Sequence, residues 1–187
     1  SGGTLSLDCA DDAVHSNADI GISNGNLTIA TGDDGIHADS SLKISGGTIN
    51  VTESYEGIEG LEITVSGGTI SVVSSDDGFN AAGGNGGGMP QDNFSADSDA
   101  KITISGGKIT VDAKGDGLDS NGSLCVSGGE IFVTGPSDNG NGALDYNGDA
   151  QITGGTIVAV GMSGMAQNFG SSSTQGSILS NTATNTS

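Results

Sequence analysis

The sequence has little of what a compact layered core requires. Its 187 residues include no tryptophan, four phenylalanines and two tyrosines, whereas 35 residues are glycine. Large side chains are needed to fill a thick interior at native packing density, and this chain has few of them. A hydrophobic content of 33% would by itself be typical of disorder. The aliphatic residues recur at fixed intervals, however, so the sequence indicates an ordered repeat protein.

Positive charge is also scarce. The chain has four lysines and no arginine against 23 acidic residues, which gives a net charge of −19. Such a surface repels nucleic acid and anionic membranes, so we expect neither as a partner. An acidic polymer such as pectin would also be repelled unless bound cations bridged the two. The charge balance alone therefore favours a divalent metal.

Cysteine is limited to Cys9 and Cys125, which the repeat register described below places four coils apart. At about 4.8 Å per coil their separation is roughly 19 Å, far beyond the ~7 Å limit for a disulfide. We therefore expect both thiols to be free, and we assign neither a function. No segment resembles a signal peptide or a transmembrane span. Because the chain begins at a repeat boundary, we expect a fragment from which targeting segments are missing.

What the sequence does contain is a repeat with a glycine corner. The tripeptide SGG, or its variants SNG and TGG, begins at residues 1, 23, 45, 66, 105, 127 and 153. Successive starts are 22, 22, 21, 39, 22 and 26 residues apart, and the two long intervals are one period plus an insertion. The insertions are residues 83–99 and four residues near Pro136. A period of about 22 residues predicts one solenoid domain over residues 1–187, with residues 170–187 as a C-terminal cap or tail.

Each repeat carries three short apolar segments. Two alternating residues such as Ile49 and Val51 follow the corner, one residue such as Ile58 comes next, and a pair such as Ile63 and Val65 closes the coil. Alternation with period two indicates strands with one buried face. We therefore predict an all-β fold, a right-handed parallel β-helix with three parallel sheets around a narrow core. A nonapeptide calcium roll and a leucine-rich repeat are excluded by the period and by the absence of a helical segment.

An acidic motif lies between the first two apolar segments of each repeat and forms two columns. The residue before the glycine position of the motif forms one column, and the residue after the buried aliphatic forms the other. The first column is Asp12, Asp34, Glu56, Asp77 and Asp116, and the second is His15, His37, Glu59, Asn80, Asp119 and Asp145. Like charges stacked about 4.8 Å apart repel one another, and four lysines are too few to offset this. A calcium ion takes six to eight oxygen ligands and can bridge adjacent coils.

The middle repeats are the best candidates for calcium, because both columns supply oxygen there. We predict as ligands Glu56, Glu59, Asp77, Asn80, Asp116 and Asp119, with Asp34 and Asp76 as accessory ligands. The alternative is that these acids only stabilise turns, as aspartate beside glycine commonly does. His15 and His37 are poor calcium ligands, and two histidines fall short of a transition-metal site. We interpret those two as surface residues.

Three features together resemble a family of secreted clostridial carbohydrate-binding β-helix proteins: the SGG corner, the DDG-aliphatic motif and the run GMSGMAQNFGSSSTQGSIL. The resemblance covers nearly the whole chain. It implies binding of cellulose and acidic sugars, a fold like that of calcium-dependent pectate lyases, and a secreted or cell-surface location. At Asp76, Asp77 and Asn80 the chain is similar to an acidic DDxxD-like calcium motif, with asparagine in place of the last carboxylate.

Two functions remain open. The first is a calcium-binding, non-catalytic and monomeric domain that recognises plant cell-wall polysaccharide, either cellulose or polygalacturonate. For this function the best ligand-binding residues are Tyr55 beside the acidic columns, Phe132 facing outward on the first sheet, and Lys114. A structural solenoid with outward threonines and serines is a weaker interpretation, because these residues are ordinary strand formers.

The second function is a calcium-dependent polysaccharide lyase. Such enzymes remove the proton next to a uronate carboxylate with a basic side chain. Lys114 is the only lysine near the acidic columns and would be that base. An ion pair of Lys114 with Asp112 or Asp116 is the simpler interpretation, so we favour the non-catalytic function.

Overall fold

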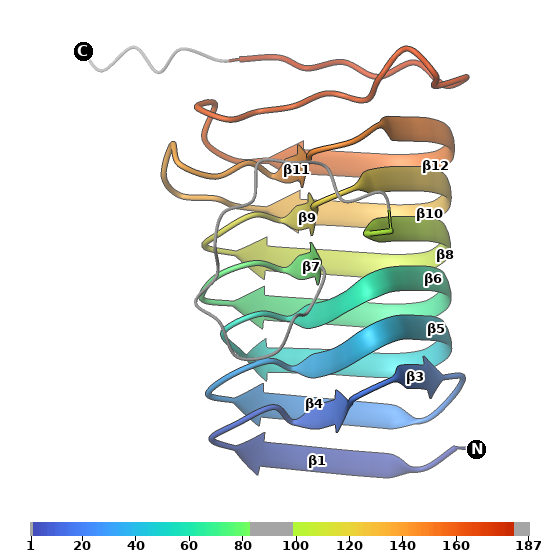
Figure 1. Ribbon diagram of the computed structural model, residues 1–187, viewed down its shortest axis with the longest axis vertical. Coiled ribbons are helices and arrows are strands. Elements are labelled where there is room, and N and C mark those ends of the chain that lie inside the picture. The colour runs from blue at the N-terminus through green and yellow to red at the C-terminus, as the bar shows by residue number, and fades with distance from the viewer. Residues whose placement is uncertain (1, 83–98, 182–187) are drawn as a thin grey trace.

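The computed structural model describes residues 2–82 and 99–181. Over that part of the chain it is all-β, with parallel strands stacked coil upon coil (Figure 1). The strands are β1 Thr4–Cys9, β2 Val14–Ser16, β3 Asp19–Ile22, β4 Asn26–Thr31, β5 Ile36–Glu53, β6 Ile58–Ser74, β7 Phe79–Ala81, β8 Lys101–Ala113, β9 Leu118–Ser120, β10 Ser123–Thr134, β11 Leu144–Tyr146 and β12 Ala150–Val160. Within the described residues, no helix is long and apolar enough to cross a membrane. The predicted insertion at 83–99 lies outside the described residues except for its last position.

Three ladders of parallel pairing run along the stack. The first joins β1, β4 and the C-terminal parts of β5, β6, β8, β10 and β12, and the second joins β2, the starts of β5 and β6, then β7, β9 and β11. The third joins β3 to the middle of β5 and β6 and to the starts of β8, β10 and β12. Several strands continue through the corners, so the ladders form one continuous sheet of 12 strands. The parallel solenoid predicted from the repeat is thus confirmed.

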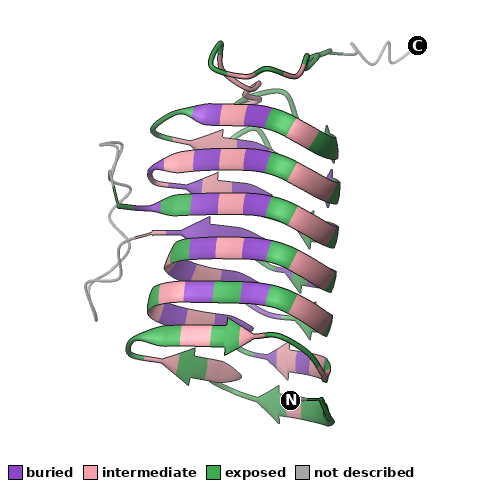
Figure 2. Cartoon of the chain, turned by 90° about the vertical axis from the view of Figure 1, so that its right-hand side faces the viewer, coloured by how far each residue is buried: buried purple, intermediate pink, exposed green. Residues whose placement is uncertain are grey.

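A narrow aliphatic core lies inside the coils. Buried residues alternate with exposed or half-buried ones along successive coils (Figure 2). The inward positions are mostly isoleucine and valine, whose branched side chains pack well on a pleated surface. Phe79 is the one aromatic residue that is fully buried among the described residues. A core one side chain deep therefore explains how the chain folds without tryptophan.

The two end coils bury less of their apolar surface than the middle ones. Leu5 in β1 is 49% exposed, whereas Ile49 and Ile70, its counterparts in the middle coils, are 1% exposed. The difference arises because an inner coil is covered on both sides and an end coil on one. At the other end, the amides of Thr174 and Gln175 donate to the carbonyl of Ile152 at 3.1 and 3.2 Å. Residues after β12 therefore lie across the last coil.

The glycine corner has a conformational cause. The second glycine of the corner has a positive φ in each repeat, for example +94° at Gly47 and +97° at Gly68. A Cβ at Gly68 would also lie 3.1 Å from the carbonyl oxygen of Gly47 in the coil beneath. Glycine tolerates both the dihedral angle and the close approach. This requirement sets the repeat boundary that is visible in the sequence.

Candidate functional site

The acidic columns lie along the second ladder. His15 pairs with His37, His37 with Glu59, Glu59 with Asn80, and the register continues to Asp119 and Asp145. The expected second column is therefore observed as a set of directly opposed residues in adjacent strands. We call the two columns together the acidic ladder. Its position follows from the buried residue at the centre of each motif, because that side chain fixes which neighbours point outward.

The glycine beside each acid holds the chain close against the core. A Cβ at Gly57 would lie 2.2 Å from Cγ1 of Val72, and a Cβ at Gly78 would lie 2.2 Å from Cγ1 of Val111. The Gly57 amide also donates to the carbonyl of Asp77 at 2.9 Å. No larger residue fits there without displacing the core. The acids that precede these glycines are thus carried on backbone that is held by both packing and hydrogen bonds.

Carboxylates of the first column bind the amides of the next coil. Oδ1 of Asp12 accepts from the amide of Asp34 at 3.2 Å, and Oδ1 of Asp34 accepts from Glu56 at 3.3 Å. Oδ1 of Asp77 accepts from Asp116 at 2.6 Å, and Oδ1 of Asp116 accepts from the Gly142 amide. The acids therefore do have a backbone-stabilising role, but they stabilise the neighbouring coil and not their own turn. This role uses one oxygen of each carboxylate.

Carboxylates crowd together in the middle coils. Three carboxylate oxygens, one each from Asp77, Asp116 and Asp119, lie within 4.8 Å of one another. Burial, followed by repulsion from Asp116, raises the pKa of Asp77 to about 8, and burial with repulsion from Asp77 does the same for Asp119. Burial also raises the pKa of Glu56 to about 8 and that of Asp116 to about 6. The fold thus disfavours these groups as bare anions.

Asn80 supplies a further oxygen at this position. The side chain is 9% exposed, and its Nδ2 donates to Oε2 of Glu56 at 2.8 Å. Its Oδ1 is buried and accepts no hydrogen bond within the described part of the chain. Because the two atoms of an amide point apart, Oδ1 faces away from Glu56. A buried carbonyl without a partner costs about 1–3 kcal/mol, so a ligand for this oxygen would stabilise the fold.

The first two coils differ because they contain the two histidines. Nδ1 of His15 lies 2.7 Å from Oδ2 of Asp12, and Nδ1 of His37 lies 3.2 Å from the same oxygen. Burial alone would raise the pKa of Asp12, but the hydrogen bonds with His15 and His37 lower it below its usual range. Every ion pair within residues 2–82 and 99–181 involves one of these histidines.

Glu59 marks the boundary between the two parts of the ladder. Burial and a hydrogen bond with Asp34 raise the pKa of Glu59, and burial also raises the pKa of Asp34. Oε2 of Glu59 also lies 3.3 Å from Nδ1 of His37. The sequence-based interpretation considered the histidines without Asp12, Asp34 and Glu59. The structure places all five side chains together.

The predicted ligand-binding residues do not form one surface. Tyr55 is 44% exposed beside the ladder, and its hydroxyl bonds Asp76, which raises the pKa of Tyr55 to about 12. Phe132 is 40% exposed on the outer face of the first ladder, between Thr110 and Val158. The pairing order β5, β6, β8, β10 places Phe132 three coils beyond the strand that leads to Tyr55.

Lys114 is exposed where β8 leads into the ladder. Its amide donates to the carbonyl of Ser74 at 3.3 Å. Among the described residues, its ammonium forms no ion pair with Asp112 or Asp116. The simpler interpretation of this lysine, an ion pair, is therefore not observed.

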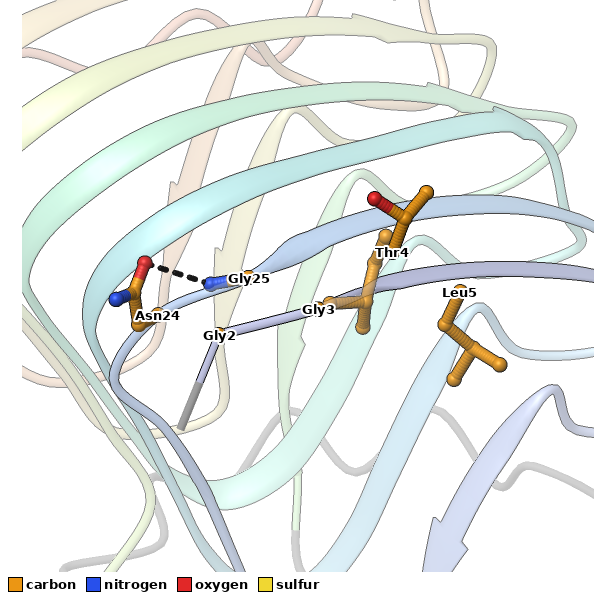
Figure 3. A pocket seen from close by; sticks show the side chains of 7 residues that line it. Gly2, Gly3, Thr4, Leu5, Asn24 and Gly25 are labelled. Atoms are coloured by element: carbon orange, nitrogen blue, oxygen red, sulfur yellow. Dashed lines mark hydrogen bonds between the residues drawn. The ribbon is translucent and has the colours of Figure 1, made fainter.

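Two hollows lie at the ends of the stack in the described part of the chain. The one at the N-terminal end is lined by Gly2, Gly3, Thr4, Leu5, Asn24, Gly25 and Leu27 (Figure 3). There the Asn24 side chain accepts a hydrogen bond from the neighbouring Gly25 amide at 2.8 Å. A second hollow, between the last coil and the residues that cross it, includes Ile152, Ile157 and Phe169. Neither hollow is lined by a carboxylate.

Comparison with known proteins gives one match. A family model described as "Carbohydrate-binding domain-containing protein" matches residues 1–35, which include Asp12, His15 and Asp34. No curated protein and no solved structure matches the chain. The match covers less than a fifth of the sequence and supports carbohydrate binding in general terms. The predicted resemblance to pectate lyases and to clostridial proteins stays a prediction.

Proposed function

We propose that this chain is a non-catalytic carbohydrate-binding domain that holds calcium in the middle coils of its acidic ladder and binds plant cell-wall polysaccharide. The observation that carries the proposal is the group of buried Asp116 and half-buried Asp77 and Asp119, beside the buried Oδ1 of Asn80, which has no hydrogen-bond partner in the described residues. A secreted or cell-surface protein related to the clostridial family would fit this function.

The donor atoms suit a hard cation. Calcium is coordinated by six to eight oxygen atoms. The side chains here offer oxygen ligands, from Glu56, Asp77, Asn80, Asp116 and Asp119. Their burial and mutual repulsion raise the pKa of the acids, and a divalent ion would offset both effects. Within the described residues, the histidines are the basic side chains that contact carboxylates of the ladder, and they lie at its other end. Calcium would supply the positive charge that the middle coils lack.

Polysaccharide would bind along the acidic ladder, beside the calcium. A uronate carboxylate can complete the coordination of a calcium ion, and the net charge of −19 would oppose polygalacturonate without such a bridge. Tyr55 lies beside these coils with its ring partly exposed, as a sugar-stacking side chain must be. For cellulose, Phe132 offers a second ring on the first ladder. The family match at residues 1–35 supports carbohydrate as the ligand class.

A polysaccharide lyase is the alternative, and Lys114 would be its base. Lysine acts as a base where burial or a neighbouring cation removes its proton, whereas Lys114 is exposed. The non-catalytic function therefore agrees better with the geometry. Incubation with polygalacturonate and calcium, followed by absorbance of the unsaturated product, separates the two. Product that disappears in Lys114→Ala would establish the lyase instead.

Calcium and polysaccharide binding can be tested together. The protein is freed of metal with chelator, titrated with calcium by calorimetry, and then applied to cellulose and to immobilised polygalacturonate with calcium or with chelator. We expect calcium to raise the melting temperature and the retained fraction together. Asp77→Asn combined with Asp119→Asn should abolish both gains. Asp112→Asn, which removes an exposed charge from the same coil as Asp116, should retain them. Unchanged calcium binding in the double variant would refute the site, and equal retention in chelator would refute the role of calcium in binding.

A further inference from the structure

We propose a second metal site, for a divalent transition-metal ion such as zinc, at the N-terminal end of the acidic ladder, with Asp12, His15 and His37 as its protein ligands. The site goes beyond the proposed calcium function in location, ligand type and metal class. It does not depend on calcium or on carbohydrate binding.

The geometry brings three ligand atoms to one point. The chain has two histidines, and they pair directly in adjacent strands, β2 and β5. Both Nδ1 atoms contact Oδ2 of Asp12, at 2.7 and 3.2 Å, and the ligand atoms of the three residues lie within 4.8 Å of one another. The rings meet edge to face with centroids 4.8 Å apart. Two imidazoles and one carboxylate are therefore assembled by the register of the fold.

Hydrogen bonding alone does not account for the surroundings of His37. Its Nδ1 faces three carboxylates at once: Asp12 at 3.2 Å, Glu59 at 3.3 Å and Asp34 at 3.5 Å. One N–H can serve one acceptor well, so Nδ1 of His37 has more carboxylates around it than a single hydrogen bond uses. A divalent ion at this position would take Asp12 as its ligand, with the hydrogen-bonded pair of Asp34 and Glu59 beside it.

The other nitrogen of His37 lies near a further carboxylate. Nε2 is 3.5 Å from Oδ1 of Asp39. In metal sites the ring nitrogen that does not bind the ion commonly donates to a carboxylate, which fixes the tautomer and the ring orientation. Asp39 would thus be a positioning residue that leaves Nδ1 of His37 free to bind the metal.

The ligand set selects the class of ion. Imidazole nitrogen favours zinc, copper and nickel, whereas calcium and magnesium prefer oxygen alone. Three protein ligands leave a coordination position for water or for a ligand. The side chains of His15 and His37 are 39% and 20% exposed, which gives the ion a route from solvent. The ladder would then hold two classes of metal, each where its ligand type is found.

The test uses the whole chain with calcium present at about 5 mM, enough to occupy oxygen-only sites of extracellular type. Zinc binding is followed by calorimetry and by NMR of the histidine ring nitrogens. The NMR spectrum is simple to assign because the chain has two histidines. We expect one zinc ion to bind and to shift the Nδ1 signals of both rings. Zinc that binds without shifting both rings, or that saturating calcium displaces, would overturn the site.

Matched variants separate the two ends of the ladder. His15→Gln and His37→Gln should each weaken zinc binding by about 100-fold, and Asp39→Asn by about tenfold, as expected for a ligand and for its orienting partner. Asp77→Asn should leave zinc binding unchanged, whether or not it alters calcium binding. Zinc affinity that is unchanged in both histidine variants, or lost in Asp77→Asn, would refute the proposal. Because both rings are partly exposed, we expect the variants to fold, and the NMR result on the unaltered chain stands without them.

Discussion

In the first two coils of the acidic ladder, a histidine imidazole lies beside each carboxylate. In the middle coils, the side chains of both columns offer oxygen atoms instead. The pKa of Asp12, which bonds two histidines, is lowered, while burial and repulsion raise the pKa of Asp77 and Asp119 to about 8. The same backbone register thus produces opposite electrostatics, because one side chain per coil differs. In the first coils the histidines hydrogen-bond a carboxylate, whereas in the middle coils burial and repulsion disfavour the charged form of the carboxyl groups.

The largest expected difference between the two regions appears as a dependence of stability on pH in chelator. In the folded state the pKa is about 8 for Glu56, Asp77 and Asp119. In the unfolded state each group has the ordinary pKa of a carboxyl group, so the folded state holds its protons to a higher pH. Their contribution to stability is therefore complete below that ordinary range and is lost as the pH rises toward 8. We expect the free energy of unfolding to fall by on the order of 5 kcal/mol between pH 4 and pH 8.

Chemical denaturation across this pH range in chelator measures the effect. The pH dependence that Asp12 contributes has the opposite sign, because its pKa is lowered in the folded state. The stability that Asp12 contributes is lost as the pH falls below the ordinary pKa range of an aspartate. Added calcium should flatten the decline at high pH. A metal-free protein whose stability is constant or rises from pH 4 to pH 8 would show that the middle carboxylates are not strained by burial.

A glycine substitution in each region tests how firmly the backbone of the ladder is held. Gly78→Ala would place a Cβ 2.2 Å from Cγ1 of Val111, so we expect a loss of about 3 kcal/mol from overpacking. Gly21→Ala, in β3 of the first coils, meets no atom within 4 Å and should change stability by less than about 1 kcal/mol. Thermal unfolding of the two variants checks the contrast. Equal effects would mean that the middle coils adapt as readily as the first ones.

The same substitution should have opposite effects in the two regions. In chelator at pH 8, Asp77→Asn removes a buried charge and can keep the bond to the Asp116 amide, so we expect a gain of about 1–2 kcal/mol. Asp12→Asn removes the partner of both histidines and should cost about 1 kcal/mol. Denaturant unfolding of both variants measures the two values. A loss in Asp77→Asn would mean that its carboxylate is stabilising without metal.

Much of the fold could be predicted from the sequence, because a solenoid repeats its constraints. The 22-residue period, the inward isoleucines and the glycine corners determine which residues stack, so the columns from His15 to Asp145 followed directly. The free state of Cys9 and Cys125 was also expected and is confirmed. Periodicity is informative here because each coil contacts only its neighbours.

Atomic contacts within the ladder were not predictable in this way. Spacing shows that His15 and His37 stack, but side-chain rotamers determine that both Nδ1 atoms meet one oxygen of Asp12. Rotamers likewise turn Oδ1 of Asn80 away from every donor in the described residues and direct the Tyr55 hydroxyl to Asp76. The separation of Tyr55 from Phe132 depends on which coil each belongs to. The metal that we propose for each part of the ladder rests on these contacts.

The most direct test of the account is the number of protons released when calcium binds at pH 7. Glu56, Asp77 and Asp119 have a pKa of about 8 without metal, so calcium must displace protons from them. Calorimetric titration in two buffers with different ionisation enthalpies measures this release. We expect at least one proton to leave for each calcium ion bound in the middle coils, and we expect the double variant Asp77→Asn with Asp119→Asn to abolish the release. Calcium binding without proton release, or no calcium binding at all, would contradict the account.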